Sequence, residues 1–450
     1  MTQRLRIGRA AVALALAASL GGCGIFGGHH HVDRGPKTAV LGNRVSVLNV
    51  GSDAVVDPSL ADVPVVVPDP APNDSWTQPG GNATKSMGDP ALPLNLRPGW
   101  STKIHSGDIT ARLGSTPAIA DGLLYVIDAD AVVEAFDANS GARRWATTLD
   151  TSKKDIAVRF GGGVAFDSGR IYATTGRGDA AALDAKTGKL LWKVRPAGPL
   201  RGSPAIGGGN VYVLTQDNQI FALKPDTGET AWTVSATLET SGVFGVAAPA
   251  MAQGTVVAGF SSGELSALRY ENGRIVWQDQ LSRTAISTSV SVISDIDASP
   301  VIDQGKVYAI GQGGRMVSMD LVTGQRLWEL VIGGINTPWL AGEWLFVVTD
   351  EAKLMCIART TGKVRWISQL PRYRDPKKKD KPIEYYGPVL AGGRLMVVSD
   401  QGKLINVAVA DGKIGTSVKA GKGFYMAPVV ANNQLYLIDV KGRLSSWRGQ

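Results

Sequence analysis

Short apolar runs recur along most of this chain, separated by Gly, Pro, Asn or Asp. In one unit, the runs at residues 211–214 and 220–223 are followed by a turn at Thr227-Gly228 and then by Trp232. Runs of this length are too short for helices, and the turn residues between them mark strand ends. Each unit therefore predicts four short antiparallel strands.

The sequence Gly-x-x-x-Trp ends each unit and gives the repeat its period. It occurs six times, at Gly141/Trp145, Gly188/Trp192, Gly228/Trp232, Gly273/Trp277, Gly324/Trp328 and Gly362/Trp366. A seventh copy has Gly412 but no Trp four residues later. Successive glycines are 47, 40, 45, 51, 38 and 50 residues apart. A period near 45 residues with strand content predicts a β-propeller.

The residues before each Trp predict a tight turn. In Asp184 to Gly188, the Gly adopts positive φ at little cost, and the polar side chains bond the turn's own backbone. We expect the Trp on the outermost strand, packed between neighbouring sheets, because exposing so large an apolar ring is costly.

A second count comes from the first strand of each unit. It carries a proline at Pro117, Pro204, Pro249, Pro300, Pro338, Pro388 and Pro428. An eighth unit at residues 163–166 keeps the pattern with Val164 instead. The chain ends short of a complete last unit, and Gly99-Trp100 resembles a repeat ending. We therefore predict an all-β, eight-bladed propeller over residues 94–450, whose last blade is closed by a strand at 94–104, which removes an exposed sheet edge.

Residues 1–22 predict a signal peptide, in which three arginines precede an apolar run at 10–20 that is too short to span a bilayer. The sequence Leu-Gly-Gly-Cys at 20–23 resembles a bacterial lipobox, which implies cleavage before Cys23 and lipidation of that cysteine. The following Gly24, by the same resemblance, favours the outer membrane. The alternative is an ordinary secretory peptide with an incidental Cys.

Residues 23–93 are rich in Pro, Gly, Asp and Val, and we expect a largely irregular tether. Its three histidines, at 29–31, are either a metal site or part of a solvated linker. The formal net charge of +8 falls to +5 without residues 1–22, which hold three arginines and no acid. No basic stripe interleaved with aromatic residues is present, so nucleic-acid binding is not expected.

Candidate chemistry is sparse. His105 is the one histidine in the predicted propeller, so any triad there would have to use it. The Gly-x-Ser-x-Gly match at 259–263 lies between two strand-like runs, whereas a nucleophile elbow joins a strand to a helix. Cys356 lies in an apolar run and is expected to be buried. We expect no catalytic residue, no metal site and no cofactor.

Two longer connections stand out. The first carries Asp295 and Asp297, whose spacing places both carboxylates on one face of an extended segment. It is either a solvated loop or a partner contact. The second, at 372–381, is rich in Lys and Arg, and either is a solvated loop or contacts anionic headgroups or an acidic partner.

The repeat at residues 184–192, Asp-Ala-Lys-Thr-Gly-Lys-Leu-Leu-Trp, resembles the quinoprotein-type propeller repeat. Combined with the lipoprotein signal, it is similar to the BamB family of outer-membrane assembly lipoproteins. The resemblance covers residues 94–450 and is supported by the segments 273–277 and 294–300.

The resemblance implies a non-enzymatic scaffold without cofactor, lipid-anchored at the periplasmic face of the outer membrane. Such a scaffold binds periplasmic domains of BamA and, through it, other assembly lipoproteins; unfolded outer-membrane protein clients are a further expected partner. In the family, loops between the third and fifth blades contact BamA. Asp295 and Asp297 match acidic positions of that surface. Val243 and Phe244 align with the companion loop, which in this chain lacks the family's Arg.

Two alternatives share the fold. A quinone (PQQ)-dependent periplasmic dehydrogenase uses the same repeat, but that family has a vicinal Cys pair and Ca²⁺ ligands, and in this chain Cys23 and Cys356 are far apart. A periplasmic binding or signalling propeller is the other. Because one fold hosts many functions, the repeat alone does not decide among them.

Overall fold

The structure is a computed structural model. It describes residues 54–106, 113–149, 162–238, 247–281, 295–312 and 314–450. Residues 52–450 form one compact unit, to which everything below refers. The only helix in the described ranges is a single 3₁₀ turn, η1 (Pro58–Leu60), and no described helix has the length and apolar character needed to cross a membrane.

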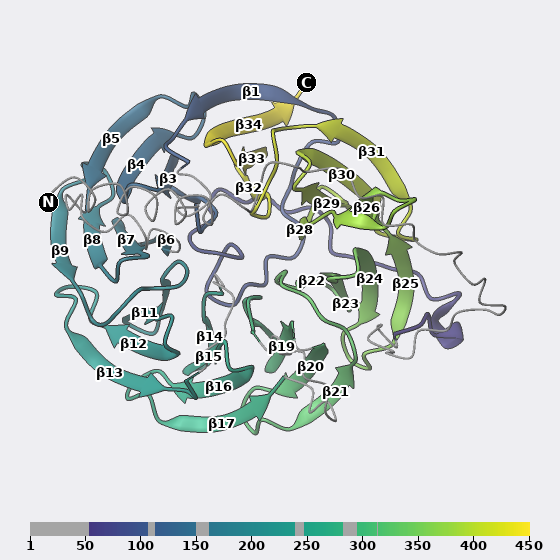
Figure 1. Ribbon diagram of the computed structural model, residues 1–450, viewed down its shortest axis with the longest axis horizontal. Helices are drawn as coiled ribbons and strands as arrows, with labels where there is room; N and C mark the ends of the chain where they lie inside the picture. Colours follow the sequence, from purple (N-terminus) through teal and green to yellow (C-terminus); the bar gives the residue numbers. More distant parts are fainter. Residues whose placement is uncertain (1–53, 107–112, 150–161, 239–246, 282–294, 313) are drawn as a thin grey trace, which may run out of the picture. The chain divides into compact units, whose positions relative to one another are not determined.

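Eight four-stranded antiparallel sheets form a ring, which confirms the predicted propeller (Figure 1). In seven of the sheets the chain passes from an inner strand near the axis to an outer strand at the rim, and the eighth sheet takes its outer strand from β1. Blades 1 to 8 are, in order, β2–β5, β6–β9, β10–β13, β14–β17, β18–β21, β22–β25, β28–β31 and the set β32, β33, β34 and β1.

Each blade has a first strand near the axis, then a second, a third and an outer strand. The first strands are β2 (Ala118–Ala120), β6 (Gly162–Asp167), β10 (Ala205–Gly207), β14 (Ala250–Ala252), β18 (Val301–Asp303), β22 (Trp339–Ala341), β28 (Tyr385–Ala391) and β32 (Val429–Ala431). The second are β3 (Leu123–Ile127), β7 (Arg170–Thr175), β11 (Asn210–Leu214), β15 (Thr255–Gly259), β19 (Lys306–Gly311), β23 (Trp344–Val348), β29 (Arg394–Ser399) and β33 (Gln434–Ile438). The third are β4 (Val132–Asp137), β8 (Ala180–Asp184), β12 (Gln219–Leu223), β16 (Glu264–Arg269), β20 (Arg315–Asp320), β24 (Lys353–Ala358), β30 (Lys403–Ala408) and β34 (Arg443–Gly449). The outer strands are β5 (Arg143–Thr148), β9 (Leu190–Val194), β13 (Thr230–Ser235), β17 (Ile275–Gln280), β21 (Arg326–Leu330), β25 (Val364–Gln369), β31 (Ile414–Lys419) and β1 (Leu96–Lys103).

Strand β1, from the N-terminal side of the propeller, closes blade 8. It pairs antiparallel with β34, with Leu96 opposite Gly449 and Thr102 opposite Leu444. The predicted closure is therefore confirmed, and the two ends of the propeller sequence meet within one sheet, so that the ring has no open end.

Tryptophans connect neighbouring blades around the rim, as predicted. Each outer-strand indole packs on the turn glycine of the next blade and donates its Nε1–H to a backbone carbonyl of that turn region. The seven bonds, each 2.7–3.0 Å long, join Trp100 to Ala138, Trp145 to Ala185, Trp192 to Pro225, Trp232 to Tyr270, Trp277 to Leu321, Trp328 to Arg359 and Trp366 to Val409. Each Trp thus packs its ring against the next blade and at the same time gives its one hydrogen-bond donor, the indole N–H, an acceptor.

Blade 7 departs from this pattern. Its outer strand β31 has Thr416 where the other blades have Trp, and all six of its residues are exposed. Thr416 Oγ1 instead accepts a hydrogen bond from Asn406 Nδ2 within its own blade, at 2.8 Å. The interface between blades 7 and 8 therefore lacks the tryptophan contact.

Residues 73–90, which we call the axial loop, run through the centre of the ring (Figure 1). They bond to the inner strand, or to the turn that follows it, of every blade in the order 8, 1, 2, 3, 4, 5, 6, 7. The partners of the axial loop in that order are Asn432, Ile119, Phe166, Ile206, Met251, Ile302, Trp339 and Gly392. The segment that we expected to be a tether as far as residue 93 thus contacts the propeller along this whole stretch, although it contains almost no regular secondary structure.

Buried side chains hold the axial loop against the inner strands. Trp76 is 2% exposed and stacks on Trp339, with ring centroids 6.1 Å apart. The Gln78 side-chain amide makes the two hydrogen bonds that a neighbouring strand's backbone would make. Its Oε1 accepts from Ile206 N, and its Nε2 donates to Ile206 O. Lys85 is 2% exposed, and its Nζ donates to Gln78 Oε1 at 3.3 Å. Buried contacts of its own side chains therefore hold the axial loop at the centre of the ring.

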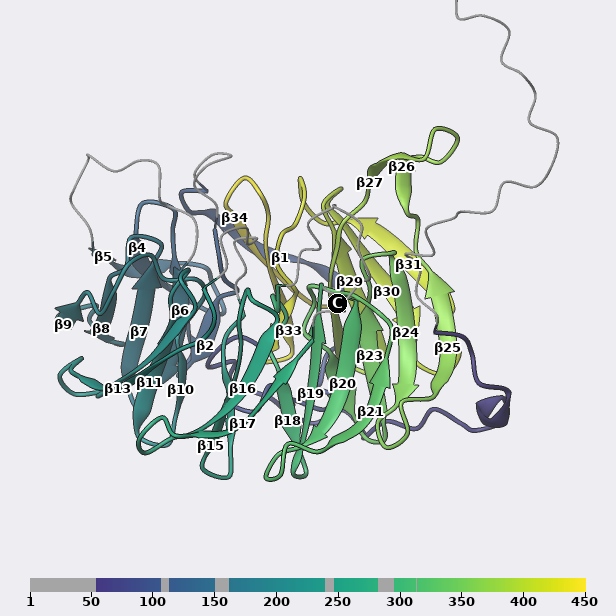
Figure 2. The same cartoon turned by 60° about the horizontal axis from the view of Figure 1, so that its bottom comes forward.

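Each blade begins and ends on the same face of the ring, because four antiparallel strands return the chain to the side from which it started. On this face a small hairpin, β26 (Tyr373–Asp375) and β27 (Asp380–Pro382), joins blades 6 and 7. Figure 2 shows the hairpin projecting beyond the neighbouring described strands. The basic connection predicted at 372–381 is thus a hairpin.

Candidate functional site

The connection from blade 4 to blade 5 is held at both ends by the same turn of blade 5. At its start, Arg315 Nη1 donates to the Gln280 carbonyl at 3.1 Å. At its end, Gln312 N donates to the Asp295 carbonyl at 2.9 Å. Gln312 and Arg315 flank the turn between β19 and β20, so Gln280 and Asp295 are both bonded to the same part of blade 5.

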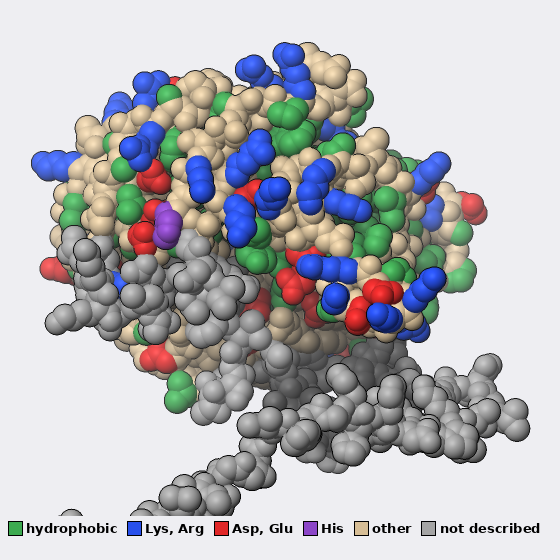
Figure 3. Space-filling view, turned by 45° about the horizontal axis from the view of Figure 1, so that its top comes forward, with side chains coloured by type: hydrophobic (Ala, Val, Ile, Leu, Met, Phe, Trp, Pro, Cys, Tyr) green, Lys and Arg blue, Asp and Glu red, His purple; other side chains and the backbone are tan. Residues whose placement is uncertain are grey.

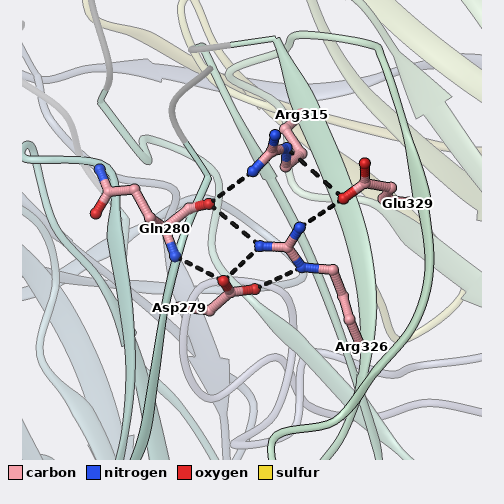
Figure 4. Close-up of polar contacts among 5 residues, drawn as sticks. All are labelled: Asp279, Gln280, Arg315, Arg326 and Glu329. Carbon is pink, nitrogen blue, oxygen red and sulfur yellow. Dashed lines mark hydrogen bonds and ion pairs between the residues drawn. The ribbon is translucent and has the colours of Figure 1, made fainter. Parts of the chain in front are cut away.

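An ion-pair network surrounds the start of this connection (Figure 4). Arg326 of blade 5 reaches back to Asp279 of blade 4, with Nε 2.9 Å from Oδ2, and also pairs with Glu329 at 2.5 Å. Glu329 lies 3.8 Å from the Arg315 Nε. These side chains are partly exposed, so the network adds less than about 1 kcal/mol per pair to stability, but it fixes the geometry of the blade 4–5 seam.

The two predicted acidic residues, Asp295 and Asp297, are buried rather than exposed. Asp295 is 0% exposed and Asp297 is 8% exposed. Asp297 Oδ1 lies 3.2 Å from Nη2 of Arg201, which precedes β10 of blade 3 and is itself 3% exposed. The pair therefore ties the entrance of blade 5 to the entrance of blade 3, across blade 4.

Burial shifts the ionisation of this acidic group. Desolvation raises the pKa of Asp297 to about 7; Arg201 opposes the rise, whereas Asp295 and Asp350 add to it. Desolvation likewise raises the pKa of Asp350 to about 6, with Glu351 adding to the effect. Removing one member of such a buried pair leaves an uncompensated charge and costs more than the pair contributes.

The predicted partner residues are thus only partly located. Val243, Phe244 and the lipidation residue Cys23 lie outside the described residues. Asp295 and Asp297 lie together at the end of the blade 4–5 connection, but in this chain their side chains present almost no surface to a partner.

A pocket of about 130 Å³ lies on the propeller axis. Its wall is formed by residues that begin the first strands, including Ser203, Asp297 and Tyr386, and Trp76 and Lys85 of the axial loop line it too. Burial lowers the pKa of Lys85 to about 7, because the charged ammonium is taken out of water.

Other candidate residues have structural partners. His105 Nδ1 lies 2.9 Å from Asp130 Oδ2 at an exposed position. Ser261, in the Gly-x-Ser-x-Gly match, lies in the β15–β16 turn and donates to Asn218 Oδ1 at 2.6 Å. Cys356 is buried in β24, as predicted, and burial raises the pKa of its thiol. Within the described ranges, no group of three His, Cys, Asp or Glu residues is placed to hold a metal ion.

Arg201 and Arg315 were missed by sequence reasoning. Arg201 lies 96 residues from its partner, and Arg315 opens a third strand just as Arg443, Lys353 and Lys403 do in other blades, so its residue type does not mark it out. The length of the connection between Trp277 and Pro300 was the one available signal that this seam differs from the others.

Comparison with known proteins gives the family. The model of the family described as "Outer membrane protein assembly factor BamB" matches residues 97–159, 129–368 and 377–448. The chain is 32% identical over 346 residues to each of two relatives with that name, from Shigella dysenteriae and Escherichia coli. In both cases the match covers 76% of this chain and 86% of the relative.

Solved structures show the same fold. BamB from Moraxella catarrhalis has a TM-score of 0.67 at 22% identity, covering 79% of this chain and all of that one. A europium-containing methanol dehydrogenase also has a TM-score of 0.67, at 15% identity, covering 84% of this chain and 98% of the other. The fold is therefore shared with enzymes, but the sequence match is to assembly factors: this chain belongs to the BamB family of outer membrane protein assembly factors.

Proposed function

We propose that this chain is a non-catalytic scaffold of the β-barrel assembly machinery, which binds periplasmic domains of BamA and so assists insertion of proteins into the outer membrane. Family membership along nearly the whole propeller is the observation that carries the proposal. Other assembly lipoproteins join through BamA, and unfolded outer-membrane proteins are the clients. The scaffold is held at the periplasmic face of the outer membrane by a lipid on Cys23.

We assign BamA binding to the connections that enter blades 4 and 5. The blade 4–5 connection is held at both ends by Gln312 and Arg315, which supports a role in presenting a contact surface. Asp297 fixes the end of this connection through Arg201, and Asp295 does so through its backbone carbonyl, which accepts from Gln312 N; neither side chain contacts BamA directly. Val243 and Phe244 provide the apolar part of the neighbouring contact.

The sequence relatives support the scaffold over a quinone-dependent dehydrogenase. The relatives at 32% identity are assembly factors, whereas the dehydrogenase structure that shares the fold is 15% identical. The chain's own Trp76 and Lys85, held by the axial loop, form part of the lining of the axial pocket.

The first test is purification of the lipidated chain from its native envelope. We expect BamA and other assembly lipoproteins to copurify. Recovery of a redox partner or of a bound quinone without BamA would favour the dehydrogenase.

The second test locates the contact. Because both ends of the blade 4–5 connection meet at one turn, residues 283–293 can be replaced by a Gly/Ser linker of about six residues, which reaches roughly 20 Å. We expect affinity for the BamA periplasmic domains to fall at least about tenfold. The matched control is the same replacement at 151–160, between blades 1 and 2, which should leave affinity unchanged. Equal affinities for both variants would reject the assigned site.

A further inference from the structure

The hairpin between blades 6 and 7 is the most basic projection described in this molecule. Residues 372–381 contain six basic and two acidic residues. Its four lysines are all exposed: Lys377, Lys378, Lys379 and Lys381. Basic side chains are also spread over the face shown in Figure 3, so charge alone does not single out the hairpin; its projection beyond the blades does.

The hairpin is an ordered platform. Asp375 Oδ1 accepts from the backbone N–H groups of Lys377 and Lys378, and Lys379 N donates to the Asp375 carbonyl. At its base, Ile383 is buried and the Tyr385 hydroxyl donates to the Pro371 carbonyl at 2.7 Å. The lysines therefore stand on a fixed backbone that is anchored in the core of blade 7.

Two of these lysines occupy costly backbone positions. Lys379 and Lys381 both have φ of +53°, a region that glycine and asparagine enter more easily than lysine. Ten other non-glycine residues in the described ranges also have positive φ, so this conformation alone does not single out the two lysines.

The tip suits a diffuse anionic surface better than a protein. Protein interfaces are enriched in aromatic residues and depleted in lysine, and the exposed turn from Pro376 to Lys379 has no aromatic or branched aliphatic side chain. Lysine presents a mobile point charge, which matches the scattered phosphates of lipid headgroups.

The N-terminal segment meets the body on the same blade. Val56 pairs with Val364 at the start of β25, and Asp57 lies 3.1 Å from Lys363. The hairpin follows directly after the end of β25. Thirty residues separate Cys23 from Ala54, a length that reaches up to roughly 100 Å when extended and so does not by itself orient the propeller.

We propose that the Lys377–Lys381 tip of the blade 6–7 hairpin binds anionic phospholipid headgroups and sets which face of the propeller is turned to the membrane. The inference rests on the proposed outer-membrane location, but it adds a second membrane contact that the lipid anchor does not provide.

The test uses the full mature chain with Cys23→Ser, so that no lipid obscures the hairpin. Cosedimentation is measured with vesicles of phosphatidylcholine containing about one third phosphatidylglycerol, and with phosphatidylcholine alone. We expect binding to the anionic vesicles only, weakening as salt rises. The triple variant K377S/K378S/K379S should bind at least about tenfold more weakly.

The matched control is K403S/K413S/K419S, at exposed positions on β30, on β31 and in the turn between them in blade 7, which removes the same charge from the wall of the propeller. It should retain most of the binding, and both variants should keep the parent's melting temperature. Equal losses in the two variants, or binding to neutral vesicles, would overturn the proposal. So would a hairpin variant that keeps vesicle binding but loses an acidic protein partner.

The same variants separate this inference from the proposed function. The hairpin variant should keep its affinity for the BamA periplasmic domains while losing the vesicles. Loss of BamA binding by the linker replacement at 283–293, with vesicle binding intact, would support the scaffold alone.

Discussion

Two rings hold the blades together, and they are built differently. At the rim, seven tryptophans each bond to the next blade, and the seam between blades 7 and 8 lacks this contact. Near the axis, residues 73–90 bond to all eight blades in order, including blades 7 and 8. The rim repeats one side-chain contact, whereas the axial loop is held mainly through the backbone. In six of the eight blades a backbone N–H of the inner strand or its turn donates to a carbonyl of the loop, and in blades 3 and 6 a side chain makes the bond.

The seam without a tryptophan is bridged by backbone instead. Strand β1 completes blade 8 from the other end of the chain, and the axial loop bonds to Gly392 in blade 7 and Asn432 in blade 8. In the other blades, the outer-strand tryptophan packs on the turn between the third and outer strands of the next blade. Blade 8 has no such turn, because its third strand β34 and its outer strand β1 are not consecutive in the chain. The comparison teaches that a ring of repeats needs non-repeating contacts at this place.

The largest expected effect tests the rim. Trp277→Ala removes a ring that is 8% exposed, together with its bond to the Leu321 carbonyl, and should cost about 3–5 kcal/mol of unfolding free energy. Thr416→Ala changes the equivalent position of blade 7 and should cost about 0.5 kcal/mol or less. Urea unfolding measures both. Similar losses would show that blade 7 is held in the same way as the others.

The next effect separates backbone strain from packing in blade 5. Gly324 has φ of +72°, and a β-carbon there would overlap the Trp277 ring. Gly305 has φ of +73° and no atom near the place of a β-carbon. Gly324→Ala should therefore cost about 3 kcal/mol, and Gly305→Ala only the strain of about 1 kcal/mol. If thermal unfolding gave equal shifts for the two variants, the tryptophan contact would carry no energy.

The smallest effect concerns the inner ring and depends on pH. The pKa of Lys85 is lowered to about 7 in the folded chain, so between pH 7 and 9 the unfolded chain binds a proton that the folded chain does not. Stability relative to Lys85→Met should therefore rise by about 1 kcal/mol per pH unit in this window and stay level below it. Lys413→Met, at an exposed site, controls for the loss of one charge. A difference that does not change with pH would mean that Lys85 is hydrated.

Much of the fold could be predicted because the apolar runs and turn residues within each repeat predict that repeat's strands and turns. Asp184 accepts from Thr187 in the predicted turn, and the outer-strand tryptophans occupy the predicted seams. The surroundings of the proposed partner site could be predicted only in part. Asp295 and Asp297 were recognised by their spacing, but their burial and the contact with Arg201 depend on a residue 96 positions away.

The sequence by itself determined the number of blades, the closing strand and the rim contacts, because these depend on neighbours within one repeat or the next. Only the tertiary structure decided that residues 73–90 pass along the axis and bond to every blade. Their contacts use backbone groups and single side chains such as Gln78 and Lys85, which leave no periodic pattern. A segment without regular structure gains its conformation from the surface it covers, and that surface exists only once the ring has closed.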